Sequence, residues 1–177
     1  MSIEFVVTNN NLPLLKQLEP LMRERLLLAL EQIGLILEKG AVLAIQNQIA
    51  PDGTTWSELA EWYIEWKKRK GFSDQIYIMS SSYLQAITHK VEDTQEEMTT
   101  VVGVMRSAGV NPDTSEEIWK IAEILEYGWE QFSVHINPRP LWRPLLEVNK
   151  RSIQTRVGAA IYWATQTIAK QAKGRVV

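Results

Sequence analysis

Apolar residues recur at every third or fourth position from Pro13 to about Gln48, which is the spacing of one face of an α-helix. Proline lacks an amide hydrogen and its ring clashes with the preceding turn, so Pro20 should break or kink this stretch early. The remaining helix, of about 28 residues from Pro20 to Asn47, would be roughly 42 Å long. That length suits a helix that lies across a sheet or lines a subunit interface. Residues 1–12 are predicted to be a short extended lead.

A turn and a second helix are predicted after this segment. Pro51-Asp52-Gly53 has the composition of a tight turn, because proline presets φ and glycine tolerates a positive φ. Ser57 is the predicted N-cap of a helix from Glu58 to about Lys70. Gly71 should end that helix, since glycine adopts the left-handed conformation at low cost.

The period then changes from that of helices to that of strands. Residues 89–92 and 98–105 alternate or are β-branched, which predicts a hairpin at about 88–105. The other predicted elements are a short helix from Ser80 or Ser81 to about Thr88, a helix after residues 111–115 that ends at Gly128, a strand from Phe132 to Ile136, and a helix from Pro144 to about Lys173. The fold class is therefore predicted to be α+β: a long N-terminal helix and several shorter helices on a small antiparallel sheet, with a long C-terminal helix. We expect a domain at residues 1–148 and a helical arm at 149–177.

Composition excludes several functional classes. The chain has no cysteine, which excludes disulfides, thiolate catalysis and thiolate metal sites. A formal net charge of −2 does not favour a dedicated nucleic-acid binder. Apolar runs such as Leu26 to Leu30 are too short to span a membrane, and the N-terminus lacks the pattern of a secretory signal. We expect a soluble protein made in the cytoplasm.

The residues that could carry chemistry do not stand in a catalytic pattern. No glycine cluster forms a phosphate loop, and Ser80-Ser81-Ser82 lacks the glycine frame of a nucleophile, so a helix cap explains it better. His89 and His135 are far apart and are interpreted as packed or surface residues. The acidic residues of the predicted fourth helix have no histidine or second acidic helix at ligand spacing: Glu116, Glu117, Glu123 and Glu126. We expect no enzymatic activity, no cofactor and no metal.

Two further clusters have a structural interpretation and a functional one. Trp62 and Trp66 lie one helical turn apart, which is typical of core or interface anchors more than of a ligand cage. The run Lys67-Lys68-Arg69-Lys70 is interpreted as a solvated helix end, where cations complement the helix dipole. The alternative for this run is contact with nucleic acid.

Four segments between residues 31 and 148 carry recognisable motifs. Ala50 to Leu59 holds the Pro-Asp-Gly turn and Trp56, and is followed by Tyr63 and a lysine-glycine ending. Ile76 to Leu84 joins an apolar lead to a small-residue cap. Ala122 to Gly128 ends in Glu-aromatic-Gly, and Pro138 to Pro144 contains Pro-Arg-Pro. In this order they resemble the tailed-bacteriophage virion-morphogenesis family, the tail-completion proteins of Mu-like phages; the last segment is also similar to one in neck proteins of siphophages.

The resemblance implies a structural virion protein, a tail-completion, tail-terminator or neck subunit. Such a subunit forms a homo-oligomeric ring, with six copies implied, that caps the tail tube and joins it to the head connector. Its partners would be itself, tail tube or sheath proteins and neck connector proteins, and DNA would pass through the lumen without specific binding. The residues expected at interfaces or in the framework are Pro51, Asp52, Gly53, Trp56, Trp62, Trp66, Gly128, Arg139, Pro140, Trp142, Arg143 and Pro144.

Two alternatives belong to other classes. A nucleic-acid-binding adaptor of a phage or mobile element would use Lys67 to Lys70 with Lys150 and Arg151, and its affinity would fall steeply with salt. An enzyme of unrecognised type would need metal- or cofactor-dependent activity.

Overall fold

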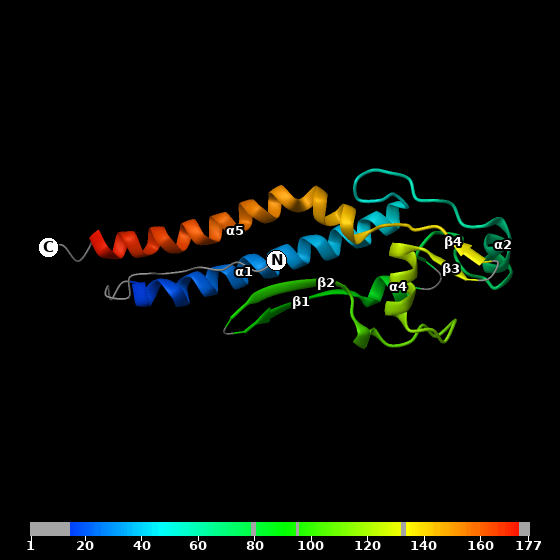
Figure 1. Ribbon diagram of the computed structural model, residues 1–177, viewed down its shortest axis with the longest axis horizontal. Coiled ribbons are helices and arrows are strands. Elements are labelled where there is room, and N and C mark those ends of the chain that lie inside the picture. Colours follow the sequence, from blue (N-terminus) through cyan, green and yellow to red (C-terminus); the bar gives the residue numbers. More distant parts are fainter. Residues whose placement is uncertain (1–14, 79–80, 95, 132–133, 174–177) are drawn as a thin grey trace. The chain divides into compact units, whose positions relative to one another are not determined.

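The computed structural model describes residues 15–78, 81–94, 96–131 and 134–173, so the extended lead predicted at residues 1–12 lies outside the described part. The elements, in chain order, are α1 (Leu15–Asn47), α2 (Glu61–Arg69), α3 (Ser82–Ala86), β1 (Ile87–Asp93), β2 (Met98–Val104), the 3-10 turn η1 (Arg106–Ala108), α4 (Ile118–Tyr127), β3 (Trp129–Gln131), β4 (Val134–Ile136) and α5 (Trp142–Lys173) (Figure 1). Two long helices, shorter helices and small antiparallel sheets confirm the predicted α+β class.

The chain divides into two compact units. The first unit contains the described residues up to Leu35, residues 90–101 and those from Lys150 on; the second contains residues 36–89 and 102–149. Both long helices and the β1–β2 hairpin therefore contribute to each unit. The predicted division at residue 148 stays a prediction.

In the first unit, α1 and α5 lie side by side and run antiparallel (Figure 1). Leu26, Ala29 and Ala160 form its buried cluster, against which Met98 and Ile161 pack. Ala29 and Ala160 are small, so the backbones of α1 and α5 can approach each other closely at this contact. Arg23 pairs with Asp93 of the hairpin, and Arg156 Nη1 donates to Gln32 Oε1 over 2.9 Å.

In the second unit, the C-terminal half of α1 packs against the start of α5. Ala41 and Ile45 are fully buried on α1, and so is Leu141, next to the first turn of α5. A Cβ on Gly40 would lie 2.8 Å from Leu145 Cδ1, so the glycine allows the two helices to touch. The core of this unit therefore fixes the position of the segment that leads into α5.

Three predicted helix boundaries are wrong. α1 continues through Pro20, because so near the helix start the missing proline amide costs only one backbone hydrogen bond. α2 begins at Glu61 after Ala60, so Ser57 is not its cap. α4 begins only at Ile118, since the preceding residue, Glu117, forms a β-bridge with Val110.

The second hairpin is only half predicted. Trp129 pairs with Ile136 and Glu130 with His135, so β3 and β4 form an antiparallel pair. The sequence predicts the strand at β4 but not the one at β3. The predicted start of the β4 strand, Phe132, lies outside the described residues. A three-residue strand is too short to reveal its period.

Candidate functional site

Arg139 organises the extended segment between β4 and α5. It is only 4 % exposed, and its guanidinium donates to three backbone carbonyl oxygens: Nε to Ser57 over 2.8 Å, Nη2 to Glu58 over 2.9 Å and Nη1 to Asn137 over 3.2 Å. Its amide donates to Leu125 O of α4 over 2.7 Å. One side chain therefore joins the segment after the Pro-Asp-Gly turn, the segment after β4 and helix α4.

An aromatic cluster holds the same segment from the other side. Trp56 Nε1 donates to Pro140 O over 3.0 Å, and the Tyr77 hydroxyl donates to Arg139 O. The rings of Trp56 and Tyr77 have centroids 5.0 Å apart, and those of Tyr77 and Tyr83 5.2 Å. All three aromatic side chains are buried, and burial raises the pKa of Tyr77 and Tyr83. These phenols therefore stay neutral in the physiological range.

Glu126 caps the first turn of α5 from a neighbouring helix. Its Oε2 accepts from the Leu141 amide over 2.7 Å and the Trp142 amide over 3.2 Å, and its Oε1 accepts from Arg143 over 3.3 Å. Pro144 has no amide hydrogen to satisfy. A carboxylate at a helix N-terminus also interacts favourably with the helix dipole. Trp142 to Pro144 are thus helical, so α5 begins two residues before the start predicted at Pro144.

Gly128 lets α4 turn sharply into β3. Its φ is 78° and its ψ 174°, a backbone conformation that only glycine adopts readily. An added Cβ would lie 2.8 Å from Ile136 O and 3.0 Å from Pro138 Cδ. The predicted helix stop is confirmed, and the close approach of the chain after β4 is a second reason for glycine.

Lys67 is buried, although the sequence predicts a solvated helix end. Only 2 % of the residue is exposed, and its Nζ donates to Gln75 O and Ile78 O, each over 2.7 Å. Burial lowers its pKa to about 8. The prediction is wrong for Lys67 alone, because the segment after Gly71 folds back over one face of α2. Lys68, Arg69 and Lys70 are exposed as expected.

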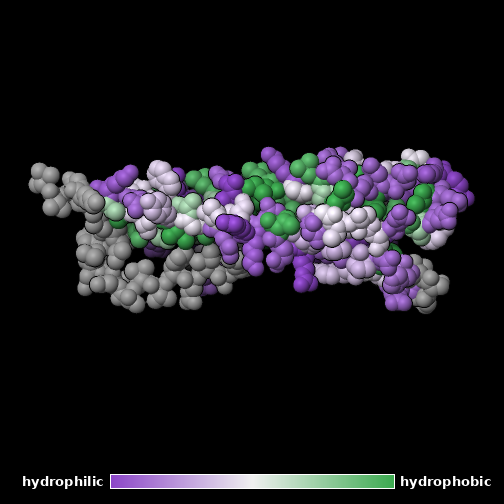
Figure 2. Space-filling model, turned by 90° about the horizontal axis from the view of Figure 1, so that it is seen from above, coloured by the Kyte–Doolittle hydropathy of each residue, from purple (hydrophilic) through white to green (hydrophobic). Residues whose placement is uncertain are grey.

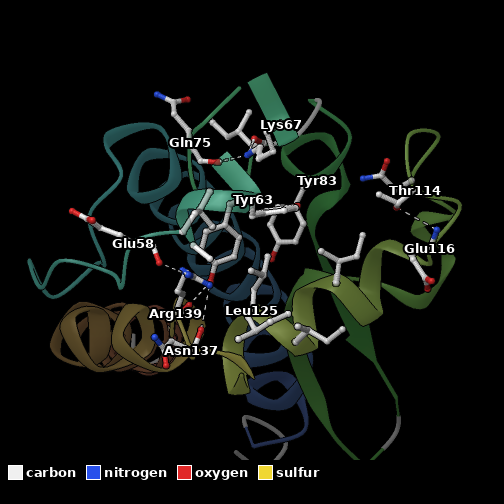
Figure 3. Close-up of a pocket in the computed structure, with 18 of the residues that line it drawn as sticks. Glu58, Tyr63, Lys67, Gln75, Tyr83, Thr114, Glu116, Leu125, Asn137 and Arg139 are labelled. Carbon is white, nitrogen blue, oxygen red and sulfur yellow. Dashed lines mark hydrogen bonds between the residues drawn. The ribbon is translucent and has the colours of Figure 1, made fainter. Parts of the chain in front are cut away.

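Arg139, Lys67, Tyr77 and Tyr83 line a pocket of about 740 Å³ in the second unit. Figure 3 shows Arg139 and Lys67 on its wall with the Tyr63 ring between them in that view, and Tyr83 beside Tyr63. Lys67 Nζ lies 5.9 Å from the centroid of the Tyr63 ring. Aliphatic side chains complete the lining: Leu59, Ile78, Ile121, Ile124, Leu125 and Ile136. The buried Tyr83 hydroxyl has no hydrogen-bond acceptor among the described residues.

The predicted Pro-Asp-Gly turn forms as expected. Gly53 has a φ of 85°, and its amide donates to Ala50 O over 2.8 Å. Asp52 Oδ1 accepts from the Thr54 hydroxyl over 2.7 Å and from the Thr54 amide over 3.0 Å, which lowers the pKa of Asp52. Pro51 is the second residue of the turn and is half-buried. The turn delivers Trp56 to the buried cluster.

The two tryptophans of α2 differ in environment. Trp62 is 64 % exposed at the pocket, whereas Trp66 is half-buried, its ring stacked on Tyr63 at 5.6 Å. Of the residues expected to act together, the structure unites Trp56, Gly128 and Arg139 with Pro140 in one network. Arg143 joins this network through its amide, which donates to Glu126, whereas the Trp66 ring contacts Tyr63 and Phe72.

The residues weighed for catalysis have other partners. His89 Nδ1 lies 2.6 Å from Glu38 Oε2, and His135 Nε2 lies 2.9 Å from Asn137 Oδ1. Ser81 Oγ accepts from the Gln85 side chain over 3.2 Å instead of capping α3. Within the described ranges, no three histidine, aspartate or glutamate side chains are grouped to hold a metal ion.

The sequence offers Lys67 for nucleic-acid contact and Glu126 among the acidic residues weighed for catalysis, but it does not predict that they or Tyr77 build this site. Tyr77 and Glu126 stand inside motif segments that it singled out, but their partners are distant in sequence. The only signal for Glu126 is its place two residues before Gly128.

Comparison with protein-family models, with curated proteins and with solved structures finds no match for this chain. No helix in the described part of the chain is both long enough and apolar enough to cross a membrane.

Proposed function

We propose that this chain is a structural subunit of a tailed bacteriophage, which forms a ring at the tail–neck junction. The ring would cap the tail tube and join the tail to the head connector. One observation carries the proposal: the four motif segments that resemble the tail-completion family all meet in the network around Arg139 and Glu126. A family pattern spread over the chain is expected when its residues build a common framework.

Exposed apolar side chains support assembly into an oligomer. In the first unit, Leu28 and Leu35 of α1 and Tyr162 and Trp163 of α5 are exposed, the last two by 63 % and 60 %. Figure 2 displays several apolar patches between polar ones on the face that it draws. Aromatic residues are enriched in the cores of protein interfaces. A closed ring needs two different faces on each subunit, and we assign one of them to this part of α5.

The charge balance supports a passage for DNA without specific binding. A net charge of −2 would give a lumen that does not hold the phosphate backbone tightly. The adaptor alternative loses one of its cations, because the Lys67 ammonium is buried against two backbone carbonyls. Lys68 Nζ lies 3.4 Å from Asp74 Oδ2. DNA affinity that falls steeply with salt would favour the adaptor over the ring.

The ring can be tested by the mass of the native assembly and by negative-stain imaging of the purified chain. We expect a single closed oligomer, which Trp163→Glu weakens and Trp163→Phe preserves. Circular dichroism of both variants checks that the fold is retained. A strict monomer at assembly concentrations would overturn the ring. If both variants keep the oligomer, the interface lies elsewhere on the surface.

A further inference from the structure

Two cations are buried at the same pocket, and neither forms an ion pair with a carboxylate of the described residues. Arg139 and Lys67 are 4 % and 2 % exposed, and the acceptors they use are all backbone carbonyl oxygens. Buried charges in proteins are usually paired with an opposite charge, because desolvation is costly. The negative charge of Asp74 raises the pKa of Lys67, but Asp74 is exposed and its carboxylate lies beside Lys68. Among the described residues, the two cations therefore have no direct ion pair, although Glu58 and Glu116 also line the pocket.

Both cations retain hydrogen-bonding capacity. A guanidinium has five N–H groups, and Arg139 uses three; an ammonium has three, and Lys67 uses two. The unused donors belong to side chains that line the pocket. A bound group with acceptor oxygens would satisfy the unused N–H groups of Arg139.

We propose that this pocket binds a carboxylate carried by an apolar or aromatic body, with the carboxylate at Arg139. A guanidinium binds a carboxylate through two parallel hydrogen bonds, and two N–H groups remain for it. The body would lie among Tyr63, Tyr83 and the aliphatic side chains of α4, and a volume of about 740 Å³ is that of a typical small-molecule site. This inference is independent of the ring, because the pocket lies inside one unit of one chain.

A singly charged carboxylate fits better than a phosphate. Phosphate sites usually present several backbone amides to the anion. Here the backbone groups nearest the two cations are carbonyl oxygens, those of Ser57, Glu58 and Asn137 and those of Gln75 and Ile78. These oxygens would repel a doubly charged group. The remaining lining combines aliphatic and aromatic side chains with polar ones, among them the carboxylates of Glu58 and Glu116, which would also repel a doubly charged group.

The carboxylate could come from a free organic acid or from the side chain of a peptide with apolar neighbours. The segment Ile3-Glu4-Phe5-Val6-Val7 of this chain has the second composition. A synthetic peptide of residues 1–10 is therefore a suitable probe. With the C-terminus of both peptides amidated, the Glu4→Gln version removes the only carboxylate without altering the protein.

The test is a calorimetric titration of the full chain with 4-phenylbutyrate, 4-phenylbutyramide, inorganic phosphate and the two peptides. We expect 4-phenylbutyrate to bind with a dissociation constant on the order of millimolar, as its size allows. The amide should bind at least about tenfold more weakly, since it lacks the charge-assisted hydrogen bonds. Binding of the peptide that Glu4→Gln abolishes assigns the site to peptides. Binding of 4-phenylbutyrate without the peptide assigns it to free acids.

Pocket variants locate the binding. Thr114→Trp and Ala60→Trp place a large ring at exposed lining positions and should abolish it. Thr55→Trp, at an exposed threonine outside the lining, should leave it unchanged. Thermal melts check that each variant folds. The proposal is overturned if the acid and the amide bind equally, if phosphate binds as well as the acid, if no probe binds at 20 mM, or if both blocking variants bind normally.

Discussion

Replacing Gly128 by alanine tests whether Ile136 and Pro138 leave no room for a side chain at the end of α4. Two costs add at this position. A residue with a side chain at a φ of 78° and a ψ of 174° is strained by about 1–3 kcal/mol. The new Cβ would also lie 2.8 Å from Ile136 O and about as close to the Pro138 ring, and relieving such overpacking costs about 1–3 kcal/mol more. We expect a total loss of about 2–6 kcal/mol.

Gly109 provides a matched control for the backbone term. Its φ of 83° and ψ of −156° resemble those of Gly128, but a Cβ there meets nothing within 4 Å. Gly109→Ala should therefore cost only the conformational strain, about 1–3 kcal/mol. The difference between the two variants isolates the steric contact, because the backbone cost is common to both.

Urea unfolding followed by far-ultraviolet circular dichroism measures both losses. With a slope of about 2 kcal/mol per molar urea, the two midpoints should differ by about 0.5–1.5 M. Equal slopes would verify that the comparison concerns stability alone. If the two variants lose the same stability to within about 0.5 kcal/mol, the contact with the chain after β4 is not rigid and the steric argument is wrong.

Three further perturbations test the network and the pocket. Burial lowers the pKa of Lys67 to about 8, so above that pH the unfolded chain binds more protons than the folded one. The free energy of unfolding should therefore rise by about 1 kcal/mol between pH 7 and pH 9. The rise should be smaller in Lys67→Met and unchanged in Lys70→Met. Glu126→Gln should cost about 1 kcal/mol in a thermal melt, because the α5 cap loses its charge, whereas Glu123→Gln at an exposed position should cost nothing measurable. Trp56→Phe should cost about 1–3 kcal/mol in urea, since a backbone carbonyl loses its donor; a neutral result would mean that water replaces the indole.

Local signals explain how much of the fold the sequence predicts. The helices α1 and α5 are each longer than thirty residues, and a periodic pattern of that length still predicts a helix when it contains one proline. Gly53, Gly71 and Gly128 mark chain reversals by their own conformational freedom. Helix starts are predicted less well, because a potential cap competes with distant partners. Ser57 is the example: its carbonyl accepts from Arg139, and the chain stays extended until Ala60.

The sequence by itself determined the α+β class, the turn at Gly53 and the hairpin, since each follows from the period or the conformational freedom of neighbouring residues. Only the tertiary structure decided what the polar residues do. Arg139 reaches Ser57 and Glu58 across more than 80 positions, and Glu126 caps a helix that begins 16 residues later. The burial of Lys67 depends on a segment that folds back after Gly71. Whether a charge is solvated or enclosed depends on what packs over it, and periodicity along the chain carries no information about that.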